Sequence, residues 1–500
     1  MQDKQIPFGR LRGRTLLTAR WVIGHEAGQH VILPGGEVVL EGNRIIFVGY
    51  DFAGDVTQRI EFPHSVLAPG FIDLDALSDL DTGTLSIFNQ PSWQKGRVWP
   101  KSYMARGPYE MYTAEELVFQ KRYAFAHLIR NGITTALPIA SLFYRQWGET
   151  YDEFAAAAGE AADLGLRVYL GPAYRTGHSY VDDNGIVRLH FDEERGLAGL
   201  EEAIRFCHDF EGRSNGLIRT MLAPDRVESC TERLLRRTAA AAEELDVPVR
   251  LHCCQSSFEV DEVFRQHGVS PAEWLRKIGL LSERCLLPHA THVSGSSLDG
   301  ASGGDLEQFK EAGATIVHCP AVMARHGSAL NSFSRCLSMN IRLGLGTDGW
   351  PPDIIYNMQV GLMLCRVMDE SMETVGAEHF FDAATLGGAA ALGRDDLGRI
   401  AAGAKADLIV IDLGQEHFGQ ITDPIQAIML CGSGRDVRTV FIDGRVVMRD
   451  GVIPGFDPAE AHQKAQRQFD GLIAKYPDRT VGHPPVEAIF RPTYTHVRRS

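Results

Sequence analysis

The stretch Val66-Leu-Ala-Pro-Gly-Phe-Ile-Asp73 is a short apolar run that ends in a carboxylate, and seven similar runs follow it along the chain. Each run has the length of a buried strand, and segments with helical periodicity lie between them. The other seven runs are Gly132–Leu137, Leu166–Gly171, Leu217–Leu222, Val247–His252, Cys285–His289, Ala314–Cys319 and Ile341–Gly346. Eight strand–helix units in one unbroken stretch predict a (β/α)8 barrel of the TIM type, an α/β fold whose catalytic groups stand at the C-terminal ends of its strands.

The periodic segments between the runs are the expected helices of this barrel. They include Ala114–Asn131, Tyr151–Leu164, Cys230–Leu245, Asp305–Ala312 and Ile355–Asp369. A doubly wound open sheet, the rival architecture, would need a glycine-rich phosphate turn after its first strand. The sequence that follows Asp73 has no such turn. A barrel is therefore the predicted fold of residues 67–395.

Both ends of the chain differ from the middle, because they read as short strands separated by turns. Residues 1–66 contain Glu37-Val-Val-Leu40 and Arg44-Ile-Ile-Phe-Val-Gly49, and strand-like segments return at Ala406–Asp412 and Val437–Val447. We therefore expect a small β-sandwich domain that combines residues 1–66 with residues 396–456. A helix and an extended tail are expected to complete the chain over residues 457–500.

Composition and charge exclude several classes of protein. With 44% hydrophobic and 23% charged residues, the chain is neither disordered nor fibrous. A net charge of −14 argues against nucleic-acid and anionic-membrane partners. The nine cysteines lack C-x-x-C spacing, which predicts reduced thiols. Since neither a signal peptide nor a membrane-length apolar run is evident, we expect a cytoplasmic protein that acts on a small molecule.

Imidazole and carboxylate groups stand directly after five of the eight runs. These groups are the segment Asp73-Leu-Asp75-Ala-Leu77 after the first run, His252 at the fifth, His289 with His292 at the sixth, His318 at the seventh and Asp348 after the eighth. In a barrel, all five strand ends meet at one mouth. Nitrogen and carboxylate ligands that converge there suit a divalent metal such as zinc or iron.

Several of these motifs resemble the amidohydrolase superfamily, specifically its chlorohydrolase and deaminase branch, which acts on triazines, guanine and related rings. Val66–Asp73 is similar to the family's entry into strand 1, and Arg130-Asn-Gly-Ile-Thr-Thr135 to its strand 2. Gly346-Thr-Asp-Gly349 is similar to its strand 8. Residues 384–411 resemble the branch's return from the barrel into the β domain. The resemblance covers most of the chain.

This resemblance implies roles for particular residues. In the family, an H-x-H pair on strand 1, a histidine on strand 5 and an aspartate on strand 8 hold one metal, zinc or iron. A strand-6 histidine polarises the bound water and substrate, and a glutamate three residues after the strand-5 histidine shuttles protons. Carried over, His252 and Asp348 are metal ligands and His289 is the strand-6 residue, with His292 as its alternate. The resemblance also implies a homodimer or a higher homo-oligomer.

The chain departs from the family pattern at three positions. Asp75 and Leu77 stand where the family has H-x-H, and Gln255 stands where it has the proton-shuttling glutamate. Leucine cannot bind a metal, and an amide cannot exchange a proton at neutral pH. Asp75, His252 and Asp348 still offer three ligands, but the missing H-x-H pair leaves open whether any metal binds.

The leading functional prediction is a hydrolase that acts on a C–N or C–Cl bond of a small cyclic or heteroaromatic substrate. Its predicted catalytic residues are His289, Asp348 and Gln255, with water activated by the metal, by the His289–Asp348 pair, or by both. Two alternatives stay open. One is a metal-free lyase, isomerase or hydrolase that uses His289 and Asp348 as acid and base. The other is a non-catalytic paralogue that only binds a ligand.

Four further residues are predicted to contact the substrate. Trp93 belongs to a long aromatic loop over residues 86–112, and an aromatic side chain there can stack on a planar ring. Arg175 ends strand 3 and offers a guanidinium to a carbonyl or carboxylate. His292 and His318 follow strands 6 and 7 at the predicted mouth.

Overall fold

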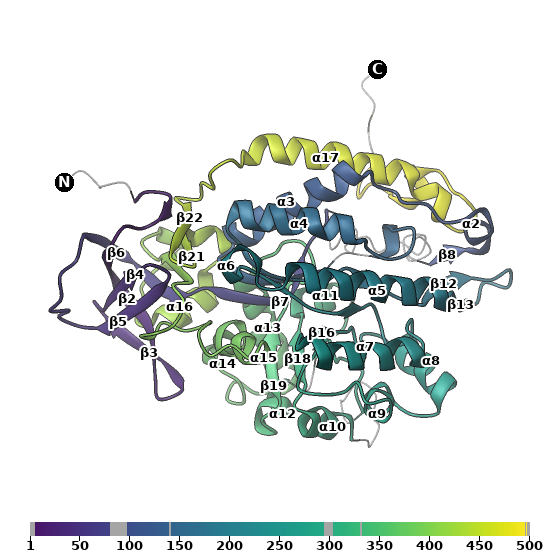
Figure 1. Cartoon of the computed structure of the whole chain (residues 1–500), viewed down its shortest axis with the longest axis horizontal. Coiled ribbons are helices and arrows are strands. Elements are labelled where there is room, and N and C mark those ends of the chain that lie inside the picture. Colours follow the sequence, from purple (N-terminus) through teal and green to yellow (C-terminus); the bar gives the residue numbers. More distant parts are fainter. Residues whose placement is uncertain are drawn as a thin grey trace.

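A computed structural model describes residues 6–80, 98–139, 142–294, 304–330, 333–495 and 497. A strand-rich end, formed by the first and last parts of the chain, lies beside a larger body in which helices surround a set of strands (Figure 1). Trp93, one of the predicted substrate contacts, lies outside the described residues.

The larger body is built on two four-stranded parallel sheets. One contains β7 (Phe71–Leu77), β9 (Ile133–Ile139), β10 (Arg167–Leu170) and β14 (Ile218–Thr220), and the other contains β16 (Val249–Arg250), β17 (Cys285–Pro288), β18 (Thr315–His318) and β19 (Arg342–Leu345). Backbone hydrogen bonds link the sheets at both seams, from Arg250 N to Leu222 O over 3.0 Å and from Asp348 N to Asp75 O over 2.7 Å. Seven of these strands coincide with predicted apolar runs, and the predicted (β/α)8 barrel is confirmed. The first run was placed too early, because residues 66–69 belong to the preceding strand β6 (Gln58–Pro69) of the terminal sheet and the first barrel strand begins at Phe71.

Helices cover the outside of the barrel. They are α3 (Ala114–Arg130), α4 (Tyr151–Leu164), α5 (Glu193–Phe210), α7 (Glu232–Leu245), α8 (Ser257–His267), α9 (Pro271–Lys277), α10 (Asp305–Ala312), α11 (Pro320–Arg325), α12 (Phe333–Ser338), α13 (Ile354–Met368), α14 (Ala377–Asp382) and α15 (Gly388–Ala391). Several begin at a side chain that caps the first turn, such as Thr113 before α3 and Asp353 before α13. The five predicted helices are present, whereas the sequence reading missed α5, which carries the acidic start Glu193-Glu194 after Asp192.

Shorter strands and helices lie in the segments that connect or follow the barrel strands. They are β8 (Trp99–Pro100), α2 (Lys101–Arg106), β11 (Ala173–Tyr174), β12 (Gly177–Val181), β13 (Val187–Phe191), α6 (Arg213–Gly216), β15 (Ala223–Pro224) and α18 (Val486–Ile489). The strand β15 pairs in parallel with β11 and leads the chain from β14 toward the barrel mouth. Within the described residues, no helix is long and apolar enough to cross a membrane. All nine cysteines are free thiols, as predicted.

The strand-rich end is a nine-stranded sheet made from both ends of the chain. Its strands are β1 (Gly9–Arg10), β2 (Arg14–Glu26), β3 (Gln29–Pro34), β4 (Glu37–Glu41), β5 (Arg44–Gly49), β6 (Gln58–Pro69), β20 (Leu408–Asp412), β21 (Val437–Ile442) and β22 (Arg445–Arg449). Gly70 separates β6 from the first barrel strand, and a Cβ there would lie 2.1 Å from the hydroxyl of Thr134. Only glycine fits this passage into the barrel. The exact boundaries of the four predicted parts of the chain (residues 1–66, 67–395, 396–456 and 457–500) stay a prediction.

A buried ion pair ties the barrel to the terminal sheet. Arg167 on β10 donates to both carboxylate oxygens of Asp407, over 2.8 and 3.1 Å, and both side chains are almost fully buried. Asp407 directly precedes β20 of the terminal sheet. Removal of one partner would leave a buried, uncompensated charge at this junction.

Arg167→Met is expected to lower the free energy of unfolding by about 3–5 kcal/mol, because Asp407 would lose its buried partner. Arg236 on α7 makes a half-exposed pair with Glu232 and serves as the matched control. Arg236→Met should change stability by about 0.5 kcal/mol or less. Urea unfolding of the three proteins measures the difference, and equal losses for both variants would contradict this account of the junction.

The C-terminal helix α17 (Pro458–Lys475) lies along α3 (Figure 1). Gln468 on α17 donates to the carbonyl of Glu116 on α3 over 3.3 Å. Near the other end of α3, the His127 ring packs against Tyr123 and Trp350, with centroids 4.5 and 4.8 Å away. Burial lowers the pKa of His127 to about 4.

A histidine with a lowered pKa in the folded state makes stability fall as the pH drops from about 6.5 toward 4, since the unfolded chain takes up the proton first. His127→Phe should therefore reduce the stability lost between pH 7 and pH 5 by about 1–2 kcal/mol. Denaturant unfolding at the two pH values measures this change. The exposed His208 provides a control, because His208→Phe should leave the pH dependence unaltered.

Candidate active site

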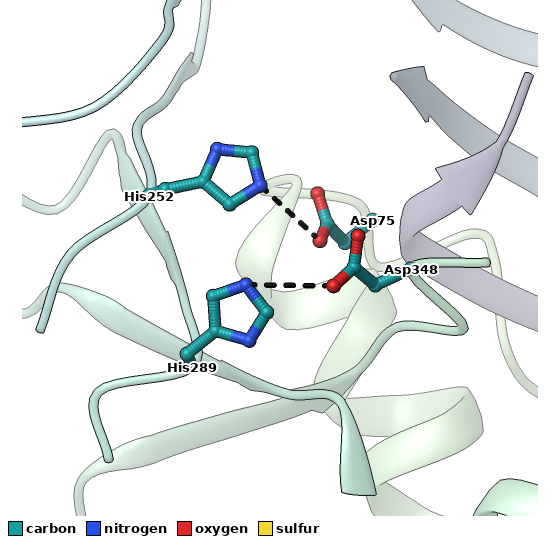
Figure 2. A group of neighbouring side chains, drawn as sticks. All are labelled: Asp75, His252, His289 and Asp348. Atoms are coloured by element: carbon teal, nitrogen blue, oxygen red, sulfur yellow. Dashed lines mark ion pairs between the residues drawn. The ribbon is translucent and has the colours of Figure 1, made fainter. Parts of the chain in front are cut away.

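Four side chains meet at the C-terminal end of the barrel strands (Figure 2). Asp75 lies on β7, His252 follows β16, His289 follows β17, and Asp348 follows β19. All four are buried, and one potential ligand atom from each lies within 4.8 Å of those from the others. The structure therefore brings together the three predicted metal ligands and the predicted strand-6 histidine.

The four groups form two imidazole–carboxylate contacts. His252 Nε2 lies 3.8 Å from Asp75 Oδ2, and His289 Nε2 lies 3.6 Å from Asp348 Oδ2. The two imidazole rings are nearly parallel, with centroids 5.4 Å apart. Burial, aided by the positive charge of Arg226, holds the pKa values of both histidines well below the ordinary value. Both rings are therefore neutral at pH 7.

The tautomer of His252 follows from its other contact. Its Nδ1 lies 2.9 Å from the carbonyl oxygen of Asp225, which can only accept, so Nδ1 carries the proton. The lone pair on Nε2 then faces the carboxylate of Asp75. Two acceptors that face each other in a buried site repel unless a cation lies between them.

The donor set fits a divalent metal. A tetrahedral ion with bonds of about 2.1 Å separates its ligands by about 3.4 Å, close to the two distances above. Among the described residues, neither ring nitrogen of the buried His289 has a hydrogen-bond partner, as expected for a group that awaits a ligand. Two histidine nitrogens and two carboxylate oxygens together make a candidate metal site.

Unusual backbone geometry accompanies these residues. Cys254, His289, Ala290 and Asp348 have φ angles between +45° and +79°, a region that non-glycine residues seldom adopt. Three strand ends of the mouth therefore carry local strain of about 1–3 kcal/mol per residue, which the surrounding hydrogen bonds must sustain. Strain of this kind concentrates at functional sites.

Asp73 anchors the two strands that carry the carboxylates. Its Oδ1 accepts from the amides of Asp75 and Thr347 over 3.2 and 3.1 Å, and its Oδ2 accepts from the Thr347 hydroxyl over 2.7 Å. Thr347 directly precedes Asp348. The Asp73 side chain thus fixes the backbone on both sides of the metal-site carboxylates.

Two arginines that the sequence reading missed reach the altered positions. Arg250 on β16 donates to Asp75 Oδ1 over 3.0 Å, and Arg226 donates to Gln255 Oε1. A usable signal existed for Arg250: it stands two residues before His252, and side chains two apart share one face of a strand. Arg226 was missed because the fourth apolar run was ended at Leu222, before the chain reaches the mouth.

The remaining predicted residues have varied surroundings. Leu77 packs in the apolar core, and Arg175 makes a buried pair with Asp225 at 3.6 Å. His292 follows the strand-6 end, where its amide donates to Cys254 O. His318 is buried beside the rings of Phe333 and Phe380. That Arg175, His292 and His318 contact substrate stays a prediction.

A family model described as "Amidohydrolase family" matches residues 67–447, which is most of the chain. The chain belongs to the amidohydrolase family. This confirms the resemblance inferred from the strand-end motifs.

Curated relatives within the family carry deaminase names. A 5-methylthioadenosine/S-adenosylhomocysteine deaminase of Halobacterium salinarum is 28% identical over 449 residues, which cover 88% of this chain and 94% of that protein. A 5'-deoxyadenosine deaminase of Methanothermobacter thermautotrophicus is 29% identical over 423 residues, which cover 83% and 90%.

Two solved structures share the fold of this family member. An adenosine deaminase from Xanthomonas campestris with bound zinc has a TM-score of 0.74 at 20% identity, covering 92% of this chain and 98% of that chain. Atrazine chlorohydrolase from Arthrobacter aurescens, complexed with zinc, has a TM-score of 0.74 at 20% identity, covering 91% and 99%. At this identity the likeness shows the common barrel architecture.

Two substitutions test the anchoring role of Asp73. Asp73→Ala should lower the free energy of unfolding by about 3 kcal/mol, because three buried hydrogen bonds lose their acceptor. Asp73→Asn should retain most of the stability, since its carbonyl can accept from the two amides and its NH2 group can donate to the Thr347 hydroxyl. Thermal and urea unfolding measure both. Equal destabilisation by Ala and Asn would show that the hydrogen bonds are not the cause.

Proposed function

We propose that this protein is a hydrolase that cleaves a C–N bond, or by analogy a C–Cl bond, of a small heterocyclic substrate at the barrel mouth. The observation that carries the proposal is the convergence of Asp75, His252, His289 and Asp348 within 4.8 Å. Membership of the amidohydrolase family and the deaminase names of the curated relatives support this reaction class.

Asp75, His252 and Asp348, with His289 beside them, would hold one zinc or iron ion. When bound, such an ion lowers the pKa of a water molecule toward neutrality and so supplies a hydroxide nucleophile. Zinc in the two similar structures supports the choice of ion. Arg250 offsets the charge of Asp75 within this set of ligands.

His289 and Asp348 are the proposed proton-transfer pair. The lowered pKa of His289 makes its ring a neutral acceptor at pH 7, and Asp348 lies 3.6 Å from its Nε2. Gln255 has a different role from the glutamate that it replaces. With its Oε1 accepting from Arg226, its amide nitrogen offers N–H donors to a substrate carbonyl or ring nitrogen.

Metal content and substrate turnover test the proposal together. Protein purified without chelator is expected to hold about one zinc or iron per chain, measured by elemental analysis. Adenosine, 5'-methylthioadenosine and 5'-deoxyadenosine should be assayed for ammonia release, and atrazine for chloride release. A chain that binds no metal and converts nothing on this panel after zinc or iron is added would contradict the proposal.

On whichever substrate turns over, Asp348→Asn and His289→Gln should each reduce kcat by about 10²-fold or more, because each removes a proton-transfer group. The matched controls are Asp183→Asn and His208→Gln, at exposed positions that the proposed reaction does not use. Both controls should retain kcat. Full activity of the Asp348→Asn variant would sink the assignment of the catalytic pair.

We also propose that the protein is cytoplasmic and that it forms a homo-oligomer, the latter because of the family resemblance. Size-exclusion chromatography with light scattering would measure the oligomeric state directly.

A further inference from the structure

Arg250 occupies a position that the proposed reaction does not by itself require. It lies on β16, and its partner Asp75 lies on β7, which is four strands away in the eight-stranded order β7-β9-β10-β14-β16-β17-β18-β19. The ion pair therefore crosses the barrel interior. Arg250 is 2% exposed and Asp75 is fully buried, so neither charge is screened by bulk water.

The two oxygens of Asp75 have separate surroundings. Oδ1 accepts from Arg250 Nη1 over 3.0 Å. Oδ2 lies 3.8 Å from His252 Nε2, with the thiol of Cys319 at 3.7 Å. One oxygen thus faces the guanidinium and the other faces the imidazole lone pair.

A carboxylate at this position differs from an imidazole in two respects. It carries a negative charge, and either of its two oxygens can bind the metal. Burying the additional charge without a partner would cost several kcal/mol. Arg250 supplies the opposite charge and holds the oxygen that points away from His252. Both differences are thereby offset by one side chain, which lies two residues before His252.

We propose that Arg250 is a positioning residue. By holding Oδ1, it makes Asp75 a monodentate metal ligand through Oδ2 and so compensates for the missing H-x-H pair. This inference rests on the proposed metal site. It goes further in making metal affinity depend on a residue that does not bind the metal. A guanidinium with only a structural role would support the fold and leave metal affinity unaltered.

The test measures zinc binding and folding separately in the full-length chain. Chelator-treated protein is titrated with Zn²⁺ against a competing indicator, and thermal unfolding is recorded without metal. Arg250→Met is expected to weaken zinc binding at least tenfold per folded chain and to lower the apoprotein Tm. Arg250→Lys, which keeps the charge without the planar fork, should fall between the wild type and Arg250→Met.

A double substitution distinguishes a specific effect on the metal site from a general loss of folding. Asp75→His alone leaves Arg250 buried without its carboxylate and is expected to lower Tm and weaken zinc binding. Asp75→His combined with Arg250→Met removes that stranded charge, and its zinc affinity and Tm should exceed those of Asp75→His. Strictly additive effects of the two substitutions would overturn the coupling that the proposal requires.

The outcomes separate this inference from the function on which it rests. If the wild type binds zinc and Arg250→Met binds it equally well, Arg250 has no positioning role, whereas the proposed function stands. If the wild type binds neither added zinc nor added iron, both the metal site and the role of Arg250 are wrong. Cobalt(II) adds a spectroscopic check, because a change in donor geometry alters its visible absorption bands, and identical spectra for wild type and Arg250→Met would count against the inference.

Discussion

At the seam between β19 and β7, the amide of Asp348 donates to the carbonyl of Asp75 over 2.7 Å. This bond joins the last barrel strand to the first and brings the two metal-site carboxylates together. At the opposite seam, the amide of Arg250 donates to Leu222 and holds the strand that leads to His252. Because both seams are closed, parallel strands far apart in the sequence direct their ends to one mouth. The geometry of the site depends on this closure.

Charge is the second constraint, since the barrel interior excludes water from ionised groups. Asp75 is matched by Arg250 across the barrel, and Arg226 reaches Gln255 beside the mouth. Two of the three altered positions, Asp75 and Gln255, are thus contacted by an arginine, whereas the third, Leu77, packs in the apolar core. Replacing an imidazole by a carboxylate inside a barrel alters both the charge and the geometry of the site. Arg250 offsets the charge of Asp75 and holds one of its oxygens.

Local patterns were sufficient to predict most of the fold. Seven of the eight apolar runs coincide with barrel strands, whereas the first lies mostly in β6 of the terminal sheet, and the segments around α3, α4, α7, α10 and α13 show a clear helical period. Prediction failed where the pattern is weaker or the element is short. The helix α5 was passed over, and the strand β15, only two residues long, carries the chain to Asp225 and Arg226 at the mouth. Packing against β11 defines that strand, and packing is not visible in a single segment.

The sequence by itself determined the residue types that follow each strand, and with them the family and the candidate ligands Asp75, His252, His289 and Asp348. It did so because strand period and strand-end position are local properties of the chain. The tertiary structure decided which oxygen of Asp75 faces His252, which tautomer His252 adopts, and that Arg250 and Arg226 contact the two altered positions. Those features depend on distances between residues far apart in the sequence, 175 positions in the case of Asp75 and Arg250, and such distances exist only after the barrel has closed.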